Sequence, residues 1–261
     1  MATATGEMAP RSGLGATDRR DAWWAGPLAT ALGLGAFGVY ATFRALYNAD
    51  YLVDSPVSAH ILSPFFSPLI ILPGMPSWFS PAFLILWAPG GFRLTCYYYR
   101  KAYYRAFLLD PPACAVGEPR TKYGGETRLF LFQNLHRYFM YLALIFLVIL
   151  SYDVLLALIW PSPTGGYRVG VSLGTLVLAA NVVLLSLYTF SCHSFRHLIG
   201  GGLDCFSCAK GGLTRHRLWS RVSEINAHHM LWAWTSLFMV GFADFYVWMI
   251  ASGRWADFRL F

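Results

Sequence analysis

Hydrophobic residues along this chain gather in five long runs, separated by shorter polar or basic segments. About 20 consecutive apolar residues in a helix are enough to cross the hydrocarbon core of a bilayer. Each of the five runs reaches that length. The pattern therefore predicts an all-α integral membrane bundle of five transmembrane helices, at residues 27–47, 80–99, 129–160, 169–199 and 222–251.

A further apolar stretch, residues 61–75, is broken by Pro64, Pro68 and Pro73. Proline interrupts a helix because it lacks the backbone N–H and its ring clashes with the preceding turn. We therefore expect an interfacial or re-entrant segment here rather than a sixth span.

The polar segments define the predicted domain organisation. Residues 1–26 carry basic side chains without the short apolar region and cleavage site of a signal peptide, so we expect a cytoplasmic tail. Residues 27–251 form the five-helix membrane domain, and residues 252–261 form a short outer tail.

The composition agrees with a membrane protein. The chain is 56% hydrophobic and only 13% charged, with a mean hydropathy of +0.46. An ordinary soluble domain is about 25% charged. These values exclude a disordered protein, a coiled coil and a nucleic-acid-binding protein. Aromatic residues reach 17%, as expected where many helix ends lie at lipid–water boundaries.

The distribution of basic residues predicts the orientation. With the N-terminus in the cytoplasm, only four of the 20 Lys and Arg residues fall on the outer side: Arg44, Arg168, Arg254 and Arg259. Inner segments of membrane proteins are enriched in Lys and Arg, so we expect the N-terminus inside and the C-terminus outside.

Two inner loops, residues 100–128 and 200–221, then form a broad basic cytoplasmic face. Such a face fits simple inside-positive topology with contact to anionic lipid. It also fits a docked protein partner, which would contact the basic residues Arg120, Lys122, Arg215 and Arg217.

The histidines favour a cofactor or redox site at the cytoplasmic end. Only one of the seven, His60, is predicted on the outer side. Five lie near the inner ends of the last three predicted spans: His136, His193, His197, His228 and His229. By helical rise, His193 and His229 fall at similar depths, roughly 10 Å below the inner membrane surface. Ionisable residues at that depth normally face a bundle interior, a cavity or a cofactor.

A C-x-x-C motif, Cys205 to Cys208, lies in the loop between the last two predicted spans. Zinc sites, iron–sulfur sites and dithiol redox sites all use this spacing. Two thiolates with two imidazoles suit zinc, or a [2Fe–2S] cluster with two Cys on one iron and two His on the other. The alternative is a pair of reduced, buried cysteines. The predicted metal ligands are Cys205, Cys208, His193, His197 and His229.

Two segments resemble a known family. Residues 191–201, SCHSFRHLIGG, and residues 228–234, HHMLWAW, resemble the fourth and fifth spans of actinobacterial-type membrane-anchor subunits of succinate dehydrogenase and fumarate reductase. The resemblance extends over most of the chain from Trp23 onward. It implies a bacterial plasma-membrane protein, docked to a flavoprotein subunit and an iron–sulfur subunit, that passes electrons to a quinone, expected to be menaquinone. The chain alone would have no activity.

One feature departs from that family's usual pattern. Five-span anchors commonly hold two haems between four histidines at two depths, whereas the first two spans here contain no His. Two such haems cannot be assembled. A single haem b remains an alternative, with His193 or His197 opposite His229. The C-x-x-C motif favours a [2Fe–2S] cluster first, one haem second and structural zinc third.

Further residues are candidates for the quinone and for protons. A quinone head group needs an apolar pocket with a few polar groups. Residues at the right predicted depth are Arg196, His136, Tyr138, Ser223, Trp232 and Trp234. Two intramembrane acids toward the outer side, Asp153 and Asp244, could begin a proton path or be helix-end residues. The rival function is a five-helix transporter or channel with a structural zinc site. Few Pro or Gly interruptions in the last three spans argue against it.

Overall fold

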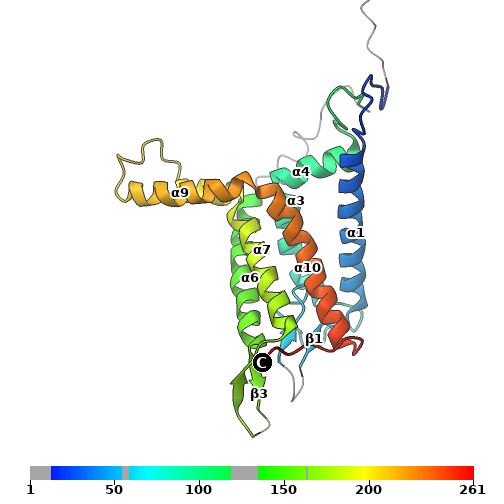
Figure 1. The fold of residues 1–261 in the computed structure, drawn as a ribbon, viewed down its shortest axis with the longest axis vertical. Coiled ribbons are helices and arrows are strands. Elements are labelled where there is room, and N and C mark those ends of the chain that lie inside the picture. Colours follow the sequence, from blue (N-terminus) through cyan, green and yellow to red (C-terminus); the bar gives the residue numbers. More distant parts are fainter. Residues whose placement is uncertain (1–12, 55–58, 119–134, 163) are drawn as a thin grey trace, which may run out of the picture.

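The computed structural model describes residues 13–54, 59–118, 135–162 and 164–261, and within these ranges the chain is mostly helical. Four of the described helices are long and apolar enough to cross a membrane. They run side by side along the long axis of the molecule (Figure 1). They are α1 (Ala25–Tyr47), α6 (His136–Ala157), α7 (Leu173–Phe190) and α10 (His229–Ala251).

These helices confirm the first predicted span and the central parts of the third, fourth and fifth. Residues 129–134 of the third predicted span lie outside the described residues. Helix α7 begins at a capping box, because the Ser172 side chain accepts from the Thr175 amide and the Thr175 side chain accepts from the Ser172 amide.

The prediction of one continuous helix over residues 80–99 is wrong. This segment contains α2 (Ala82–Ile85) and α3 (Trp87–Leu94), which follow each other almost without a break, since the Gly90 amide still donates to the Leu86 carbonyl. The helix then stops, and Cys96 is extended with φ −64° and ψ 132°.

After this break the chain leaves the bundle axis. Helix α4 (Tyr97–Tyr103) and a π-helical turn, η1 (Tyr104–Leu108), run across the upper end of the bundle (Figure 1). Their sequence alternates tyrosines with basic residues, a composition that favours the membrane interface over the hydrocarbon core.

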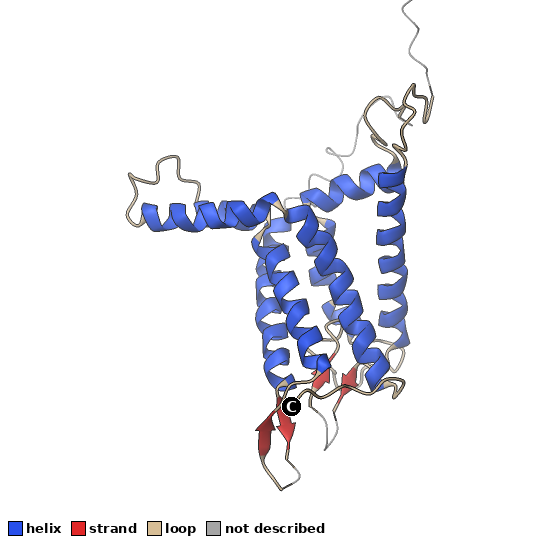
Figure 2. Cartoon of the chain, viewed as in Figure 1, coloured by secondary structure: helices blue, strands red, loops and turns tan. Residues whose placement is uncertain are grey.

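The fourth and fifth predicted spans are also shorter than expected. Helix α7 ends at Phe190, Cys192 is extended, and α8 (His193–Gly200) starts a separate element. Helix α9 (Gly212–Ala227) projects sideways from the same end of the bundle as α4 (Figures 1 and 2).

The sideways course of α9 corrects the predicted depth of two histidines. The helix carries several Arg residues, which are costly in hydrocarbon, so it stays out of the bundle axis. His228 and His229 therefore lie at the very start of α10, and not two turns inside a span.

The opposite end of the bundle carries two small antiparallel hairpins, shown in red in Figure 2. They are β1 (Leu52–Val53) with β2 (Ile61–Leu62), and β3 (Ile159–Pro161) with β4 (Tyr167–Val169). The stretch 61–75 contains no helix, as its prolines predicted. The C-terminus lies at this end, far from α9 (Figure 1).

Packing among the long helices is uneven. Within its most apolar window, 56% of α10 is buried inside the protein, compared with only 6% of α1. Helix α10 therefore forms the centre of the bundle, together with α6 and α7, while α1 stands at its edge (Figure 1).

Candidate functional site

Two buried thiols and two imidazoles meet at the α9 end of the bundle. We call this set, Cys96, His136, Cys192 and His229, the Cys–His cluster. His136 and His229 are the first residues of α6 and α10, and the two cysteines are the extended residues at the helix breaks after α3 and α7. The sequence analysis did not predict these two helix breaks, and they turn the thiols toward the interior of the bundle.

Each imidazole faces one thiol. The distance from His136 Nε2 to Cys192 Sγ is 3.0 Å, and that from His229 Nε2 to Cys96 Sγ is 3.4 Å. Cys96, Cys192 and His136 are almost completely buried. The four side chains come from four separate parts of the chain: the breaks after α3 and α7 and the first residues of α6 and α10. The helices must therefore pack together before the Cys–His cluster can form.

The other nitrogen of each imidazole is held by a hydroxyl. Thr95 Oγ1 lies 2.9 Å from His136 Nδ1, and Ser191 Oγ lies 2.7 Å from His229 Nδ1. Anchoring of this kind fixes the ring orientation, as it does for histidines that bind metals.

Aromatic rings support both imidazoles from one side. The His136 ring stacks on Phe92 at a centroid distance of 4.8 Å and an interplanar angle of 3°. The His229 ring stacks on Tyr188 at 5.2 Å and 19°. The Nε2 atoms therefore have well-defined positions relative to the thiols.

The donor set fits a [2Fe–2S] cluster. Two thiols and two imidazoles are the ligands of a centre in which two His replace two Cys on one iron. Among the described residues, no three His, Cys, Asp or Glu side chains converge as a single metal ion would require. A two-iron cluster would take two protein ligands on each iron, so it does not need three side chains to converge on one atom.

A half-buried arginine, Arg93, lies beside the Cys–His cluster. The Arg93 guanidinium donates to Tyr99 Oη at 2.7 Å, to the Ala233 carbonyl at 3.1 Å and to Ser236 Oγ at 3.0 Å. It lies 4.6 Å from the ring centroid of Tyr188. No described carboxylate pairs with it, and the described groups that contact its positive charge are neutral.

Arg93, Tyr188 and Thr189 form the polar part of a mostly apolar central cavity of about 180 Å³. The Tyr188 hydroxyl is completely buried, lies beside the Cys96 thiol, and forms no hydrogen bond with a nitrogen or oxygen atom of the described residues. From there the cavity extends along α6 and α7 to Pro64 and Phe65 near the opposite end. A concave apolar space with a few polar groups is typical of a small-molecule site.

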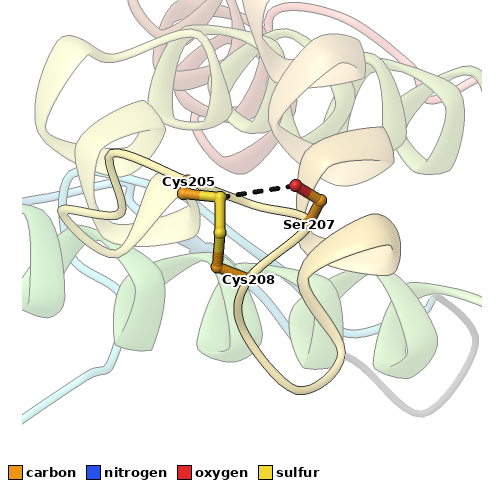
Figure 3. Close-up of a disulfide and its surroundings, with 3 residues drawn as sticks. All are labelled: Cys205, Ser207 and Cys208. Atoms are coloured by element: carbon orange, nitrogen blue, oxygen red, sulfur yellow. Dashed lines mark hydrogen bonds between the residues drawn. A yellow bond between two sulfur atoms is a disulfide. The ribbon is translucent and has the colours of Figure 1, made fainter.

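The structure does not assemble the predicted metal ligands. Cys205 and Cys208 form a disulfide in an exposed loop between α8 and α9, where Cys205 Sγ lies 3.3 Å from Ser207 Oγ (Figure 3). The loop begins at the glycines that end α8 and lies at the outer end of α9 (Figure 1). The two-residue gap brings the two sulfur atoms together as predicted, but they bond to each other and not to a shared metal.

Two of the three histidines that were predicted as metal ligands also lie away from the Cys–His cluster. His193 is exposed beside Tyr97, with a ring distance of 6.0 Å, and His197 is exposed with Nδ1 3.1 Å from Arg137 Nη2. Only His229 of the five predicted ligands belongs to the Cys–His cluster. An exposed His193 or His197 is also poorly placed for the alternative of one haem opposite His229.

None of the six predicted quinone residues lines the central cavity. His136 belongs to the Cys–His cluster. Arg196 donates to Ser223 Oγ at 2.8 Å and joins α8 to α9. Tyr138 is exposed on α6. Trp232 and Trp234 donate to the Ile225 carbonyl and to Tyr98 Oη.

The two predicted proton-path acids have different surroundings. Asp244 forms a completely buried ion pair with Arg44, at 2.8 Å from Nε to Oδ2, and also accepts from Tyr40 and Ser63, both at 2.5 Å. These contacts favour a structural role. Asp153 is buried and accepts a hydrogen bond from Ser67.

The residues that prediction missed share a repeated signal. A hydroxyl residue precedes each cluster cysteine, in Thr95–Cys96 and in Ser191–Cys192. In each pair the hydroxyl holds one imidazole and the thiol faces the other. In the sequence, the only trace of this arrangement is a hydroxyl residue directly before each of the two cysteines.

Comparison with known proteins agrees with the resemblance. The family model described as actinobacterial succinate dehydrogenase subunit SdhC matches residues 25–253. A solved chain of the Mycobacterium smegmatis Sdh1 complex in the apo form is similar, with 42% sequence identity, a TM-score of 0.83 and 99% of each chain covered. No curated protein matches. The chain therefore belongs to the actinobacterial SdhC family, the membrane subunits of succinate dehydrogenase complexes.

Proposed function

We propose that this chain passes electrons from an iron–sulfur subunit through a [2Fe–2S] cluster to menaquinone in the membrane. The main support for this proposal is the Cys–His cluster, which lies between the α9 end of the bundle and the central cavity. The proposal keeps the predicted chemistry of two thiols and two imidazoles and replaces most of the predicted ligands.

The four residues of the Cys–His cluster would hold the group, two through thiolates and two through imidazoles. When bound, such a cluster carries one electron at a time, and its imidazoles raise the reduction potential above that of an all-Cys centre. The protein excludes water from the site and fixes both imidazoles through Thr95 and Ser191.

We place the menaquinone head group in the central cavity, beside Arg93 and Tyr188. The Tyr188 hydroxyl, which has no nitrogen or oxygen partner among the described residues, is available to donate to a quinone oxygen, and the Arg93 charge favours the electron-rich, reduced form of the ligand. Apolar residues farther along the cavity, such as Leu147, Leu150 and Phe65, suit the isoprenoid tail.

In this proposal the bundle crosses the membrane five times, with residues 80–94 as a short second crossing. The N-terminus and the α9 end face the cytoplasm of the bacterium and the C-terminus faces outside. The flavoprotein and iron–sulfur subunits dock at the α9 end. Of the basic residues predicted to contact them, Arg215 and Arg217 lie exposed on α9, whereas Arg120 and Lys122 lie outside the described residues.

Proton uptake is a separate part of the proposal. Asp153 stays a candidate for a proton path, because its carboxyl group has no basic partner within salt-bridge distance among the described residues. Asp244 is less suitable, since its carboxylate is neutralised by Arg44. The rival transporter function with structural zinc loses two of its supports, because Arg44 neutralises Asp244 and because Cys205 and Cys208 form a disulfide.

The experiment is an iron and sulfide analysis of the purified complex carrying Cys192→Ser. Cys114→Ser is the matched control, because Cys114 is an exposed free cysteine. We expect Cys192→Ser to lose two irons and two sulfides per complex, and to stop quinone reduction while succinate still reduces an artificial acceptor. Full iron content and normal quinone reduction in Cys192→Ser would overturn the proposal.

A further inference from the structure

One seam of the bundle has two openings that the proposed electron path does not use. The first, which we call the inner crevice, has a volume of about 330 Å³ and lies between the start of α1, α4 and the start of α10. The second, the outer groove, has a volume of about 310 Å³ and lies between the later turns of α1 and α10.

Both openings follow the same stripe of each helix. On α1 the stripe is Gly26, Thr30, Gly33, Phe37 and Tyr40, spaced three or four residues apart, so these residues share one face. At Gly33 the two helices touch, because a Cβ atom there would lie 3.0 Å from the Trp234 ring. The crevice and the groove are therefore two parts of one seam.

The inner crevice offers hydrogen-bond donors and positive charge. Tyr98, Lys101 and Arg105 lie three or four residues apart and line it from one side. Trp234 Nε1 donates to Tyr98 Oη at 2.6 Å, which leaves the Tyr98 proton free to donate in turn. No Asp or Glu among the described residues lines the crevice.

Neither cation forms a salt bridge with a described residue. Lys101 is exposed, and Arg105 donates to the Pro112 carbonyl at 3.3 Å, while Asp110 lines a neighbouring cavity together with both. By contrast, Arg19 is already paired with Asp21. An anion with several acceptor oxygens, such as a phosphodiester, matches these donors.

The outer groove is lined by apolar and aromatic side chains, including Phe37, Phe238, Phe242 and Phe245. By helical rise, Phe238 and Gly241 lie about 12–16 Å along α10 from Met230 of the crevice. Half of a hydrocarbon core is about 15 Å thick. An acyl chain in the same leaflet as the head group therefore reaches the groove.

We infer that the α1–α10 seam binds one anionic phospholipid, with its phosphate at Lys101 and Arg105 and an acyl chain in the outer groove. The occupant explains why α1 is so little buried by protein, since lipid supplies the missing contacts. A quinone lacks the anionic head group that the crevice matches, and a protein segment would have to enter the hydrocarbon region. The inference requires only that the chain spans a membrane, and it does not depend on the redox centre.

The test measures the phospholipid that stays with the purified succinate dehydrogenase complex after extensive detergent washing. Two variants address the two ends: Lys101→Gln with Arg105→Gln for the head group, and Ala36→Phe, which fills the groove, for the acyl chain. Their controls are Lys210→Gln, on the exposed α8–α9 loop, and Val39→Phe, on the lipid-facing side of α1 away from the seam.

We expect both seam variants to retain at least fivefold less anionic phospholipid than the wild type, and both controls to retain the wild-type amount. After delipidation, phosphatidylglycerol should raise the melting temperature of the wild-type complex, whereas phosphatidylcholine and inorganic phosphate should not. Equal retention in all variants would overturn the inference. So would a stabilisation that inorganic phosphate alone reproduces, or a seam variant that loses menaquinone instead of phospholipid.

Discussion

At the scale of single residues, the Cys–His cluster depends on side chains that do not touch a metal. Thr95 and Ser191 hold the Nδ1 atoms, and Phe92 and Tyr188 hold the ring planes. Sequence reasoning chose His229, which lies in the Cys–His cluster, but took its cysteines from the C-x-x-C motif. The hydroxyl residue before each buried cysteine is a weak mark that also occurs at Ser207–Cys208, whereas a C-x-x-C motif is a recognised pattern.

Replacing Ser191 with alanine should weaken the proposed cluster without removing a ligand. Loss of a hydrogen bond to a metal-binding histidine typically lowers metal affinity or activity about 10- to 100-fold. We expect reduced iron content and a shifted reduction potential in the purified complex. Ser220→Ala on α9 is the control, and a Ser191→Ala complex with unchanged iron content and potential would contradict the assignment of His229.

Tyr188→Phe should separate a quinone-binding role from a packing role. A buried hydroxyl without a nitrogen or oxygen partner costs about 1–3 kcal/mol, so its removal should leave the melting temperature unchanged or higher. If the hydroxyl donates to quinone, the rate of quinone reduction should fall about tenfold, the effect of roughly 1.4 kcal/mol. Electron transfer from succinate to an artificial acceptor should be unchanged. Normal quinone reduction in this variant would remove Tyr188 from the quinone site.

At the scale of elements, the hydrophobic pattern predicted where apolar helices run but not where they stop. The runs at residues 80–99 and 169–199 read as continuous because tyrosine, cysteine and histidine do not mark a helix end. Tertiary contacts decide the matter: the extended residues Cys96 and Cys192 turn inward and their thiols face imidazoles. The predicted quinone residues were chosen by depth along unbroken helices, and none of them lines the central cavity.

The ion pair between α1 and α10 is the clearest structural link of the otherwise loosely packed α1. Asp244→Asn leaves the Arg44 charge buried without a counter-charge, and such a change typically costs about 3–5 kcal/mol. We expect a lower melting temperature of the complex and normal quinone reduction per folded complex. The paired change Arg44→Met with Asp244→Leu should be less destabilising than Asp244→Asn alone. If Asp244→Asn instead slowed quinone reduction at unchanged stability, Asp244 would belong to a proton path.

At the scale of the whole molecule, the two ends of the bundle differ in charge and in the groups that they carry. The α9 end carries exposed arginines and the Cys–His cluster, whereas the opposite end carries two short hairpins and the C-terminus (Figures 1 and 2). This polarity was predictable from the sequence, because it follows from the distribution of Lys and Arg. The sideways projection of α9 was not predictable from the sequence, because the last residues of α9 continue directly into the apolar run of α10.

Charge reversal on α9 should weaken docking of the partner subunits. We expect Arg217→Glu to release the soluble subunits from the membrane at a lower salt concentration than in the wild type, because charge attraction is screened by salt. Arg168→Glu, an exposed change at the opposite end, is the matched control. Co-purification of the subunits over a salt series measures the effect, and equal release from both variants would argue against docking at α9.

Pulsed electron paramagnetic resonance of the reduced, purified complex tests the central claim most directly. An all-cysteine cluster has no nitrogen ligand, so strong coupling to histidine nitrogen marks a centre with imidazole ligands. We predict a signal coupled to two histidine nitrogens that is lost in His136→Gln and in Cys96→Ser but retained in His193→Gln and in Cys205→Ser. A complex without nitrogen coupling, or a signal that disappears in Cys205→Ser and persists in Cys96→Ser, would contradict the account.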